Sequence, residues 1–202
     1  PHRLVMLGEL MTKRLFARNG FVNSLRSKDS GRSSGQLDSV IRPATLEDCY
    51  AIREIYNFYV SESLISFEEE PTDIQYWQEK FSLLQELGLP FIVAVSNSFE
   101  ILGFAYLAPW RQKSAYRSTA ENSIYMKQSA IGYGLGPKLL SELLRLGKLA
   151  GIKEVVAVIS DSGAETSIEM HKKFGFKKMG HLPRVGFKLN NWLGVNLMQK
   201  SL

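Results

Sequence analysis

The chain has 202 residues, of which 45% are hydrophobic and 22% charged, a composition typical of one globular domain with a short extension. No run approaches the roughly 18 apolar residues that a membrane-spanning helix needs, and one cysteine, Cys49, beside three histidines excludes an internal disulfide and argues against a metal centre. The formal net charge of +5 is uneven, because residues 1–38 carry +4 and the remainder only +1, which argues against nucleic acid as a partner.

The first 38 residues are predicted to be a flexible basic extension, followed by one domain over residues 39–202. Residues 24–39 are rich in serine and glycine, which is the composition of a linker. Residues 11–27 hold four basic residues and no acidic one, as organelle transit peptides do. The extension is therefore interpreted either as a transit peptide of a mitochondrial protein or as a plain extension of a cytoplasmic one.

Helices and strands alternate along the domain, which indicates a mixed α/β fold. Apolar residues at helical spacing mark the helices, and short β-rich runs between turn residues mark the strands. Thr45 with Asp48 resembles a helix cap and its reciprocal acid, and Thr72 resembles a second cap. The predicted elements are a strand at 40–43, helices at 46–60 and 72–88, strands at 91–96, 101–108 and 123–127, a helix that opens at the glycine-rich segment 131–136 and stops at Gly151, a strand at 154–159, a helix at 165–173, and strands at 176–183 and 194–199.

Three glycines, Gly132, Gly134 and Gly136, stand between a predicted strand and a helix. Glycines in this place let backbone N–H groups and the positive end of the helix approach a phosphate. The pattern is not that of a dinucleotide fold, since Leu139 occupies the third glycine position, nor that of a P-loop, since no Gly-Lys-Ser/Thr follows. The segment predicts either a phosphate site of another kind or a tight turn without a ligand.

Short segments spread over residues 41–202 add to the strand, glycine loop and helix. They are IRPAT (41–45), IYNFYV (55–60), ISFEEEP (65–71), APWRQKSAYRST (108–119), AENSIYM (120–126), AVISDSG (157–163), MHKKFGF (170–176), and RVGFK followed by NW (184–192). Together they resemble the GCN5-related N-acetyltransferases (GNAT), and within them the phosphinothricin and methionine sulfoximine acetyltransferase group.

This resemblance implies a strongly twisted mixed sheet that splays open at its centre, with flanking helices and with acetyl-CoA bound in the gap. It implies an enzyme that moves the acetyl group of acetyl-CoA to the amino group of a small amino-acid-like substrate, of the phosphinothricin or methionine sulfoximine type. It further implies a homodimer, no metal ion, and no nucleic-acid or membrane partner.

The resemblance also assigns roles to single residues. Glu121 matches the base that takes a proton from the amine. His171 stands where many family members keep a tyrosine that protonates the leaving thiolate, and it is interpreted as that acid, as a second base or as a structural histidine. The N–H groups of residues 124–126 are expected to bind the pantetheine arm and polarise the thioester, and the glycine loop to hold the pyrophosphate. The predicted cofactor-binding residues are Ile124, Tyr125, Met126, Gly132, Tyr133, Gly134, Leu135, Gly136 and Pro137.

The predicted substrate site combines a basic loop with the start of the central strand. Arg111 and Lys113 suit the carboxylate or phosphinate-like end of the substrate, because guanidinium and ammonium groups bind such anions. Gln112, Asn122 and Ser123 complete the predicted pocket. The alternative interpretation of Arg111 and Lys113 is that of solvated loop charges.

Three positions depart from the family pattern and keep two other functions open. Ile131 and Tyr133 replace side chains that usually assist the glycine loop, and Ala164 replaces an asparagine that commonly touches the cofactor. These departures favour an acyl-CoA-binding domain without catalysis, which the presence of Glu121 and His171 opposes. The second alternative is an acetyltransferase for peptide N-termini or polyamines, which the basic loop opposes.

Overall fold

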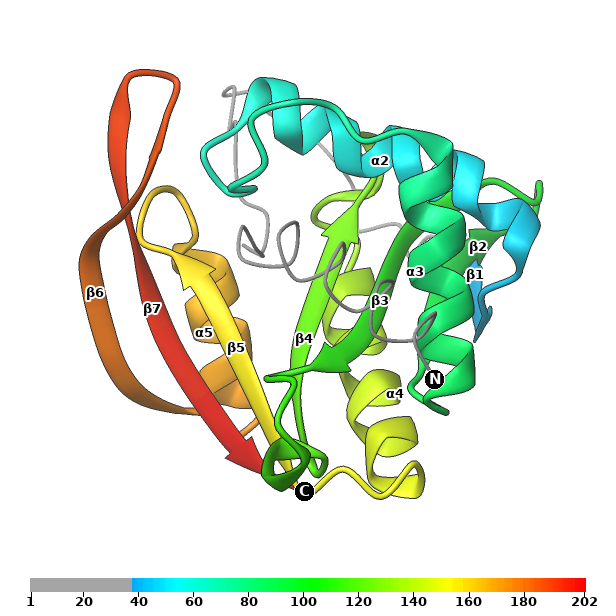
Figure 1. Cartoon of the computed structure of the whole chain (residues 1–202). Coiled ribbons are helices and arrows are strands. Elements are labelled where there is room, and N and C mark those ends of the chain that lie inside the picture. Colours follow the sequence, from blue (N-terminus) through cyan, green and yellow to red (C-terminus); the bar gives the residue numbers. More distant parts are fainter. Residues whose placement is uncertain (1–37) are drawn as a thin grey trace.

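The computed structural model describes residues 38–202, which form a seven-stranded mixed sheet with helices on both faces (Figure 1). The predicted extension at residues 1–38 lies, apart from Asp38, outside the described residues. Within the part described, no helix is long and apolar enough to cross a membrane. The strands are β1 (Ser39–Pro43), β2 (Phe91–Ser96), β3 (Ile101–Pro109), β4 (Thr119–Met126), β5 (Glu154–Ser160), β6 (Lys177–Lys188) and β7 (Asn191–Ser201), and the helices are α2 (Cys49–Glu62), α3 (Ile74–Glu86), α4 (Leu135–Leu149) and α5 (Glu165–Lys173), with 3-10 turns η1 (Leu46–Asp48), η2 (Ser114–Tyr116) and η3 (Gln128–Ala130).

The sheet is split at its centre, between β4 and β5. Its strand order is β1-β2-β3-β4-β5-β7-β6, and only β4 and β5 run parallel. These two strands pair at three positions, of which the last joins Glu121 to Val156. Beyond it β4 stays paired with β3 as far as Met126, and β5 stays paired with β7 as far as Ser160, while the two strands diverge (Figure 1). This arrangement confirms the splayed mixed sheet that the resemblance implied.

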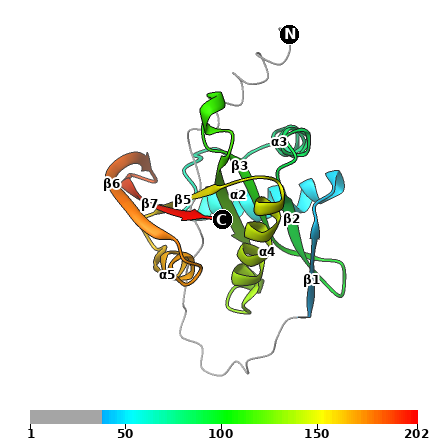
Figure 2. The ribbon, with the colours of Figure 1, turned by 90° about the horizontal axis from the view of Figure 1, so that it is seen from below.

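Apolar cores hold β4 on both of its faces. Figure 2 shows α3 on one side of the sheet and α4 and α5 on the other. Because successive residues of a strand point to opposite faces, β4 contributes to both cores. Ala120, Ile124 and Met126 pack with the leucines of α4, whereas Tyr125 packs with the aromatic residues of α2 and α3. Each large apolar side chain buried in this way is worth about 1.5–3 kcal/mol relative to exposure, so the strand beside the split is held from both sides.

The helix starts show one prediction confirmed and one corrected. Thr45 N donates to Asp48 Oδ2 at 2.7 Å, as expected for a cap with its reciprocal acid. Thr72 does not cap α3; that position belongs to Asp73, whose Oδ1 accepts from Tyr76 N at 2.8 Å. The hydroxyl of Thr72 instead accepts a hydrogen bond from the indole Nε1 of Trp77, at 2.9 Å.

The C-terminal hairpin is longer than its sequence indicates. β6 and β7 run to within two residues of each other, and the connecting residues Leu189 and Asn190 have φ angles of 46° and 62°. Two central residues with positive φ form the tight turn that matches the twist of a hairpin. Leucine is rare in such a turn, and β6 lacks a regular apolar alternation, so the predicted strands at 176–183 and 194–199 stop short of it.

Candidate active site

The split leaves one backbone edge of β4 without a strand partner. At the start of the β3–β4 pair, Trp110 N donates to Thr119 O at 3.2 Å, and at its end Lys127 N donates to Leu102 O at 2.8 Å. The register between these points is continuous, so the odd-numbered residues of β4 hydrogen-bond to β3. In an antiparallel pair the intervening residues direct their N–H and C=O groups to the opposite side. The backbone N–H and C=O groups of the even-numbered residues of β4 therefore face the split.

This alternation narrows the predicted set of N–H groups. Ile124 and Met126 direct their N–H groups into the split, whereas Tyr125 directs its N–H to β3. The prediction that the N–H of Tyr125 binds the pantetheine arm is therefore wrong. The carbonyl oxygen of Met126 accepts a hydrogen bond of 2.5 Å from the hydroxyl of Tyr59, which in turn accepts from Gln128 Nε2 at 2.7 Å. These contacts fix the end of β4 beside the split.

The glycine loop leads directly into α4. Gly132 and Gly134 have φ angles of 89° and 76°, a region that other residues seldom adopt, and a Cβ at either position would meet nothing within 4 Å. The N–H groups of Leu135 and Gly136 belong to the first turn of α4, where no intrahelical acceptor is available. Pro137, also predicted to bind the cofactor, cannot donate a backbone hydrogen bond to a phosphate, because proline has no N–H. The loop therefore offers donors and the positive end of a helix.

Glu121 lies at the apex of the split, on the same face of β4 as Ser123 and Tyr125. Tyr106 stands opposite Ser123 and is thus the diagonal neighbour of Glu121 on that face. Burial raises the pKa of the Tyr125 hydroxyl well above its usual value, and the charges of neighbouring groups, Glu121 among them, add to the rise. The carboxylate therefore borders a buried cluster of tyrosines.

Lys80 of α3 places a buried cation in this cluster. Its side chain is 2% exposed, and Nζ donates to the hydroxyls of Tyr76 at 2.7 Å and Tyr106 at 3.1 Å. The ammonium also lies 4.6–5.0 Å from the ring centroids of Tyr76, Trp77 and Tyr106. The sequence does not indicate this role for Lys80, because a lysine in an amphipathic helix is typical of the solvent face.

Asn122 and His171 form a buried pair on the other face of the sheet. Asn122 Nδ2 lies 3.0 Å from His171 Nε2, and His171 Nδ1 lies 2.8 Å from the carbonyl oxygen of Ser167. Burial lowers the pKa of His171 to about 4, so the imidazole is neutral near pH 7. With its proton on Nδ1, His171 has none at Nε2 to give, which does not fit the predicted acid. Asn122, predicted as a substrate ligand beside Ser123, faces away from it.

Two buried polar atoms at the apex have no hydrogen-bond partner among the described residues. They are Asn122 Oδ1 and Ser123 Oγ, on side chains that are 5% and 2% exposed. An unpaired buried polar atom costs about 1–3 kcal/mol, and structures usually pair such atoms with a ligand or water. One such atom on each face of β4 fits the binding of a polar molecule in the split.

His171 is expected to make stability fall in weak acid. A histidine in the unfolded chain has a pKa near 6.5, so below that pH the unfolded state takes up a proton that the folded state, with its pKa of about 4, does not. The free energy of unfolding is therefore unaffected by protonation of this histidine above pH 6.5, and it falls by about 3 kcal/mol as the pH falls towards 4. Urea unfolding of the wild type and of His171→Phe between pH 7 and 4 measures it. Equal slopes in both proteins would contradict it.

The predicted anion-binding loop lies at the paired end of the split. Arg111, Gln112 and Lys113 are exposed in the segment between β3 and β4, and the Arg111 guanidinium lies 5.0 Å from the ring centroid of Trp110. This segment leads into the strand that carries Glu121, at the end opposite the glycine loop. The structure thus places these side chains near the apex but outside the buried surroundings of Glu121.

Lys188 connects the two halves of the split sheet. It lies at the end of β6 with 3% of its surface exposed, and Nζ donates to the carbonyl oxygens of Ser63 and Ser66, both at 2.9 Å, just after α2. Burial lowers its pKa to about 8. Two residues earlier, Gly186 lies so close to Phe67 that a Cβ would approach its ring to 2.6 Å. Lys188 belongs to the RVGFK segment of the family resemblance, which implies no role for the lysine.

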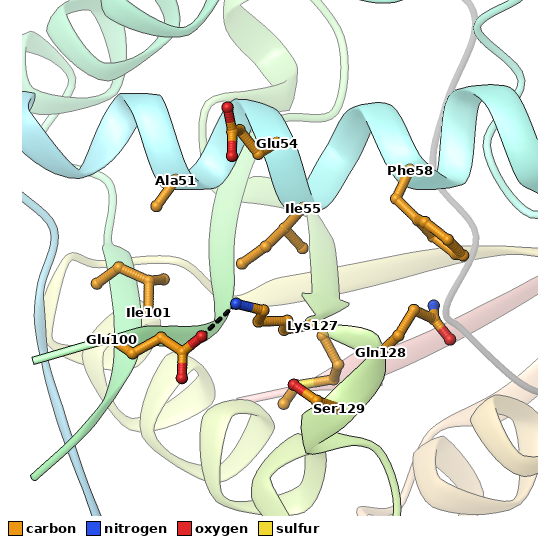
Figure 3. A pocket seen from close by; sticks show the side chains of 10 residues that line it. Ala51, Glu54, Ile55, Phe58, Glu100, Ile101, Lys127, Gln128 and Ser129 are labelled. Carbon is orange, nitrogen blue, oxygen red and sulfur yellow. Dashed lines mark hydrogen bonds and ion pairs between the residues drawn. The ribbon is translucent and has the colours of Figure 1, made fainter. Parts of the chain in front are cut away.

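A separate groove of about 420 Å³ lies between α2 and the ends of β3 and β4 (Figure 3). An ion pair of Lys127 with Glu100 crosses its floor, and Ile55 and Phe58 of α2 form the opposite wall (Figure 3). Among the predicted site residues of the described chain, Met126 alone lines this groove. Its lining residues are Ala51, Glu54, Ile55, Phe58, Glu100, Ile101, Met126, Lys127, Gln128 and Ser129.

Comparison with known proteins adds the family context. Residues 52–176 match the model of the acetyltransferase (GNAT) family. The chain is 34% identical over 166 residues to the L-methionine sulfoximine/L-methionine sulfone acetyltransferase of Pseudomonas aeruginosa, which covers 82% of this chain and 96% of that protein. It is 36% identical over 162 residues to the phosphinothricin N-acetyltransferase of Alcaligenes faecalis, with 80% and 82% covered. The phosphinothricin acetyltransferase of Sinorhizobium meliloti in complex with AcCoA superposes with a TM-score of 0.78 at 34% identity, covering 81% of this chain and 88% of that one.

Proposed function

Since the chain belongs to the acetyltransferase (GNAT) family, we propose that the split between β4 and β5 is its active site. The enzyme transfers the acetyl group of acetyl-CoA to the amino group of a small amino-acid-like substrate, the activity named for its relatives. The observation that carries the site is the open edge of β4, which presents N–H groups beside a carboxylate, Glu121, at the apex.

Each part of the split has a task in this reaction. Bound acetyl-CoA supplies an activated acetyl thioester. The N–H groups of Ile124 and Met126 bind and align its arm, and those of Leu135 and Gly136, with the positive end of α4, hold its phosphates. Glu121 accepts a proton from the substrate ammonium and leaves a neutral, nucleophilic amine. These contacts come from the backbone, so they do not need the side chains that family members usually have in place of Ile131 and Tyr133.

The substrate is proposed to be anionic at the end remote from its amine. The loop beside the apex carries Arg111, Lys113 and Arg117, all exposed, and guanidinium groups bind carboxylates and phosphinates in paired hydrogen bonds. This charge disfavours polyamines, which are cationic. The names of the relatives, methionine sulfoximine and phosphinothricin acetyltransferases, support the same class.

The glycine loop is expected to govern cofactor affinity. Replacing Gly132 and Gly134 together by alanine imposes a backbone conformation that costs roughly 1–2 kcal/mol per residue, so the loop relaxes and its N–H groups turn from the phosphates. We expect the Kd for CoA, measured by calorimetry, to rise about tenfold or more. Gly88→Ala is the matched control, because Gly88 has a φ of 65° and equal free space at the end of α3. Equal Kd values in variant and control would contradict the phosphate site.

A homodimer is proposed through the C-terminal hairpin. β6 is an edge strand of the sheet, and β6, β7 and their turn expose a strip of large apolar side chains. Edge strands with apolar surface pair readily with a second copy of the same chain. The exposed residues of the strip are Met179, Leu182, Val185, Phe187, Leu189 and Trp192, and they are 45–63% exposed.

Charging this strip is expected to separate the copies. Phe187 and Trp192 form an exposed edge-to-face pair with centroids 5.4 Å apart, so Phe187→Glu with Trp192→Glu places two like charges at the centre of the interface. Sedimentation equilibrium should give twice the chain mass for the wild type and once for the variant. Phe99→Glu, at a side chain that is 90% exposed in the β2–β3 turn, should remain dimeric. A monomeric wild type would refute the dimer.

The function is tested by the release of CoA thiol from acetyl-CoA with a panel of amines. The panel holds methionine sulfoximine, phosphinothricin, methionine sulfone, ordinary amino acids, a polyamine and a peptide with a free N-terminus. Rapid release is expected with the first three compounds. Release of thiol only with the peptide or the polyamine would show that one of these, and not a small amino-acid-like compound, is the substrate class. No release with any amine, while CoA still binds, would favour a binding domain without catalysis.

A further inference from the structure

Asn122 is the first residue of β4 beyond the apex of the split, and its side chain reaches across to α5. It follows Glu121, the last residue paired with β5, and its Nδ2 lies 3.0 Å from His171 Nε2 on α5. Since α5 follows β5 in the chain and lies beside β5 and β7 (Figures 1 and 2), this hydrogen bond joins the two halves. The Asn122 amide therefore lies on the α5 face of the sheet, beside the point where β4 and β5 diverge.

The orientation of that amide is set by a chain of donors and acceptors. The carbonyl oxygen of Ser167 can only accept, so His171 Nδ1, 2.8 Å away, carries the imidazole proton. The pKa of about 4 keeps the ring neutral, so Nε2 has a lone pair and must accept. Asn122 then has to turn its Nδ2 to His171, which leaves its Oδ1 directed elsewhere. Burial prevents the opposite arrangement, which would bring two acceptors together.

The oxygen that this arrangement frees is an acceptor for an N–H group. Asn122 Oδ1 is buried and has no partner among the described residues. The even-numbered neighbours Ile124 and Met126 supply donors to the same split, where they suit the carbonyl groups of an amide-containing arm. An arm of this kind also carries N–H groups, which the backbone C=O groups of the even-numbered residues and the buried, unpartnered Oδ1 of Asn122 can accept. The thioester and the phosphates of acetyl-CoA have no N–H, and the amino group of its adenine lies beyond the phosphates that the glycine loop holds, so the arm is the matching part.

We infer that Asn122 Oδ1 accepts a hydrogen bond from an amide N–H of the pantetheine arm, and that His171 is a positioning residue that holds Asn122 in this orientation. The inference rests on the proposed function in taking acetyl-CoA as the ligand. It replaces a role for His171 as the acid of the leaving thiolate. It also places an acceptor at the apex, one residue from Glu121 and on the opposite face of the strand.

The Kd for CoA, measured by calorimetry without an amine, tests this inference. Asn122→Ala should raise the Kd about tenfold, the loss expected for one hydrogen bond. His171→Phe keeps the ring that packs edge-to-face on Phe176, with centroids 4.8 Å apart, but removes the acceptor, and should raise the Kd about threefold or more. The double variant should bind no more weakly than Asn122→Ala alone, because His171 acts through Asn122. Fully additive effects, or a change below twofold in Asn122→Ala, would overturn the inference.

Two further measurements keep the outcome decisive. Nitrogen-15 NMR of the wild-type histidines should show His171 protonated at Nδ1 from pH 5 to 8, and a proton at Nε2 would overturn the chain of acceptors without any variant. An Asn122→Ala protein with unchanged CoA affinity but a raised KM for the amine would assign the oxygen to the substrate instead. If no amine is acetylated while the Kd pattern holds, the proposed function fails and this binding role stands.

Discussion

Replacing Glu121 by glutamine is expected to lower kcat by about 10²- to 10⁴-fold, the usual range for a general base. The amide keeps the size of the side chain but cannot take a proton from the substrate ammonium. The Kd for CoA should stay within about twofold, because Glu121 lies on the face of β4 opposite Asn122 and its backbone bonds to β3. Stopped-flow detection of free thiol, with calorimetry for binding, measures both quantities.

The pH dependence gives this variant a distinctive signature. Amines near neutral pH are largely protonated, so a rise in pH supplies the free base from solution, and the gap between variant and wild type should narrow as the pH rises from 7 to 9. Glu86→Gln, at an exposed position near the end of α3, should behave as the wild type. A Glu121→Gln protein that retains full kcat at pH 7 would remove Glu121 from catalysis.

Replacing Trp77 by alanine is expected to cost about 3–5 kcal/mol of the free energy of unfolding, the range for a large buried aromatic residue. Trp77 is completely buried at the centre of the aromatic core, with ring centroids of Tyr56 at 5.1 Å and Phe104 at 5.4 Å. It also supports Lys80, whose ammonium lies over the indole ring. The cluster that borders Glu121 therefore loses its central support.

Thermal unfolding checks this prediction. For a domain of this size each kcal/mol lowers Tm by about 2–4 °C, so a fall on the order of 10 °C is expected for Trp77→Ala. Phe99→Ala removes an aromatic side chain that is 90% exposed and should shift Tm by no more than about 2 °C. A fall in Trp77→Ala no larger than in this control would show that α3 is not what stabilises the face of Glu121.

Local patterns were sufficient to predict most of the fold. Helical spacing and β-rich runs located every helix and strand of residues 39–202, and α5 spans the predicted residues 165–173. The two misplaced boundaries have different causes. Thr72 bonds to Trp77 instead of the helix start, whereas the hairpin turns at Leu189 and Asn190, where leucine gives no turn signal.

The candidate site was predictable in its position and less so in its chemistry. The resemblance pointed to β4 and the glycine loop, but which N–H groups face the split depends on the odd and even register with β3, which no local pattern contains. The proton on His171 depends on Ser167 O, and the buried cation of Lys80 depends on two tyrosines from separate elements. Such properties come from tertiary contacts and need the structure.

The most direct test of the central claim is to identify the product. The enzyme would be incubated with methionine sulfoximine and acetyl-CoA labelled with carbon-13 in the acetyl carbonyl, and the products examined by NMR and mass spectrometry. We predict the label in an amide on the α-amino nitrogen, formed by the wild type and nearly absent with Glu121→Gln. Labelled free acetate with the amine unchanged, or the same amide formed equally by both proteins, would contradict amine acetylation at the split with Glu121 as its base.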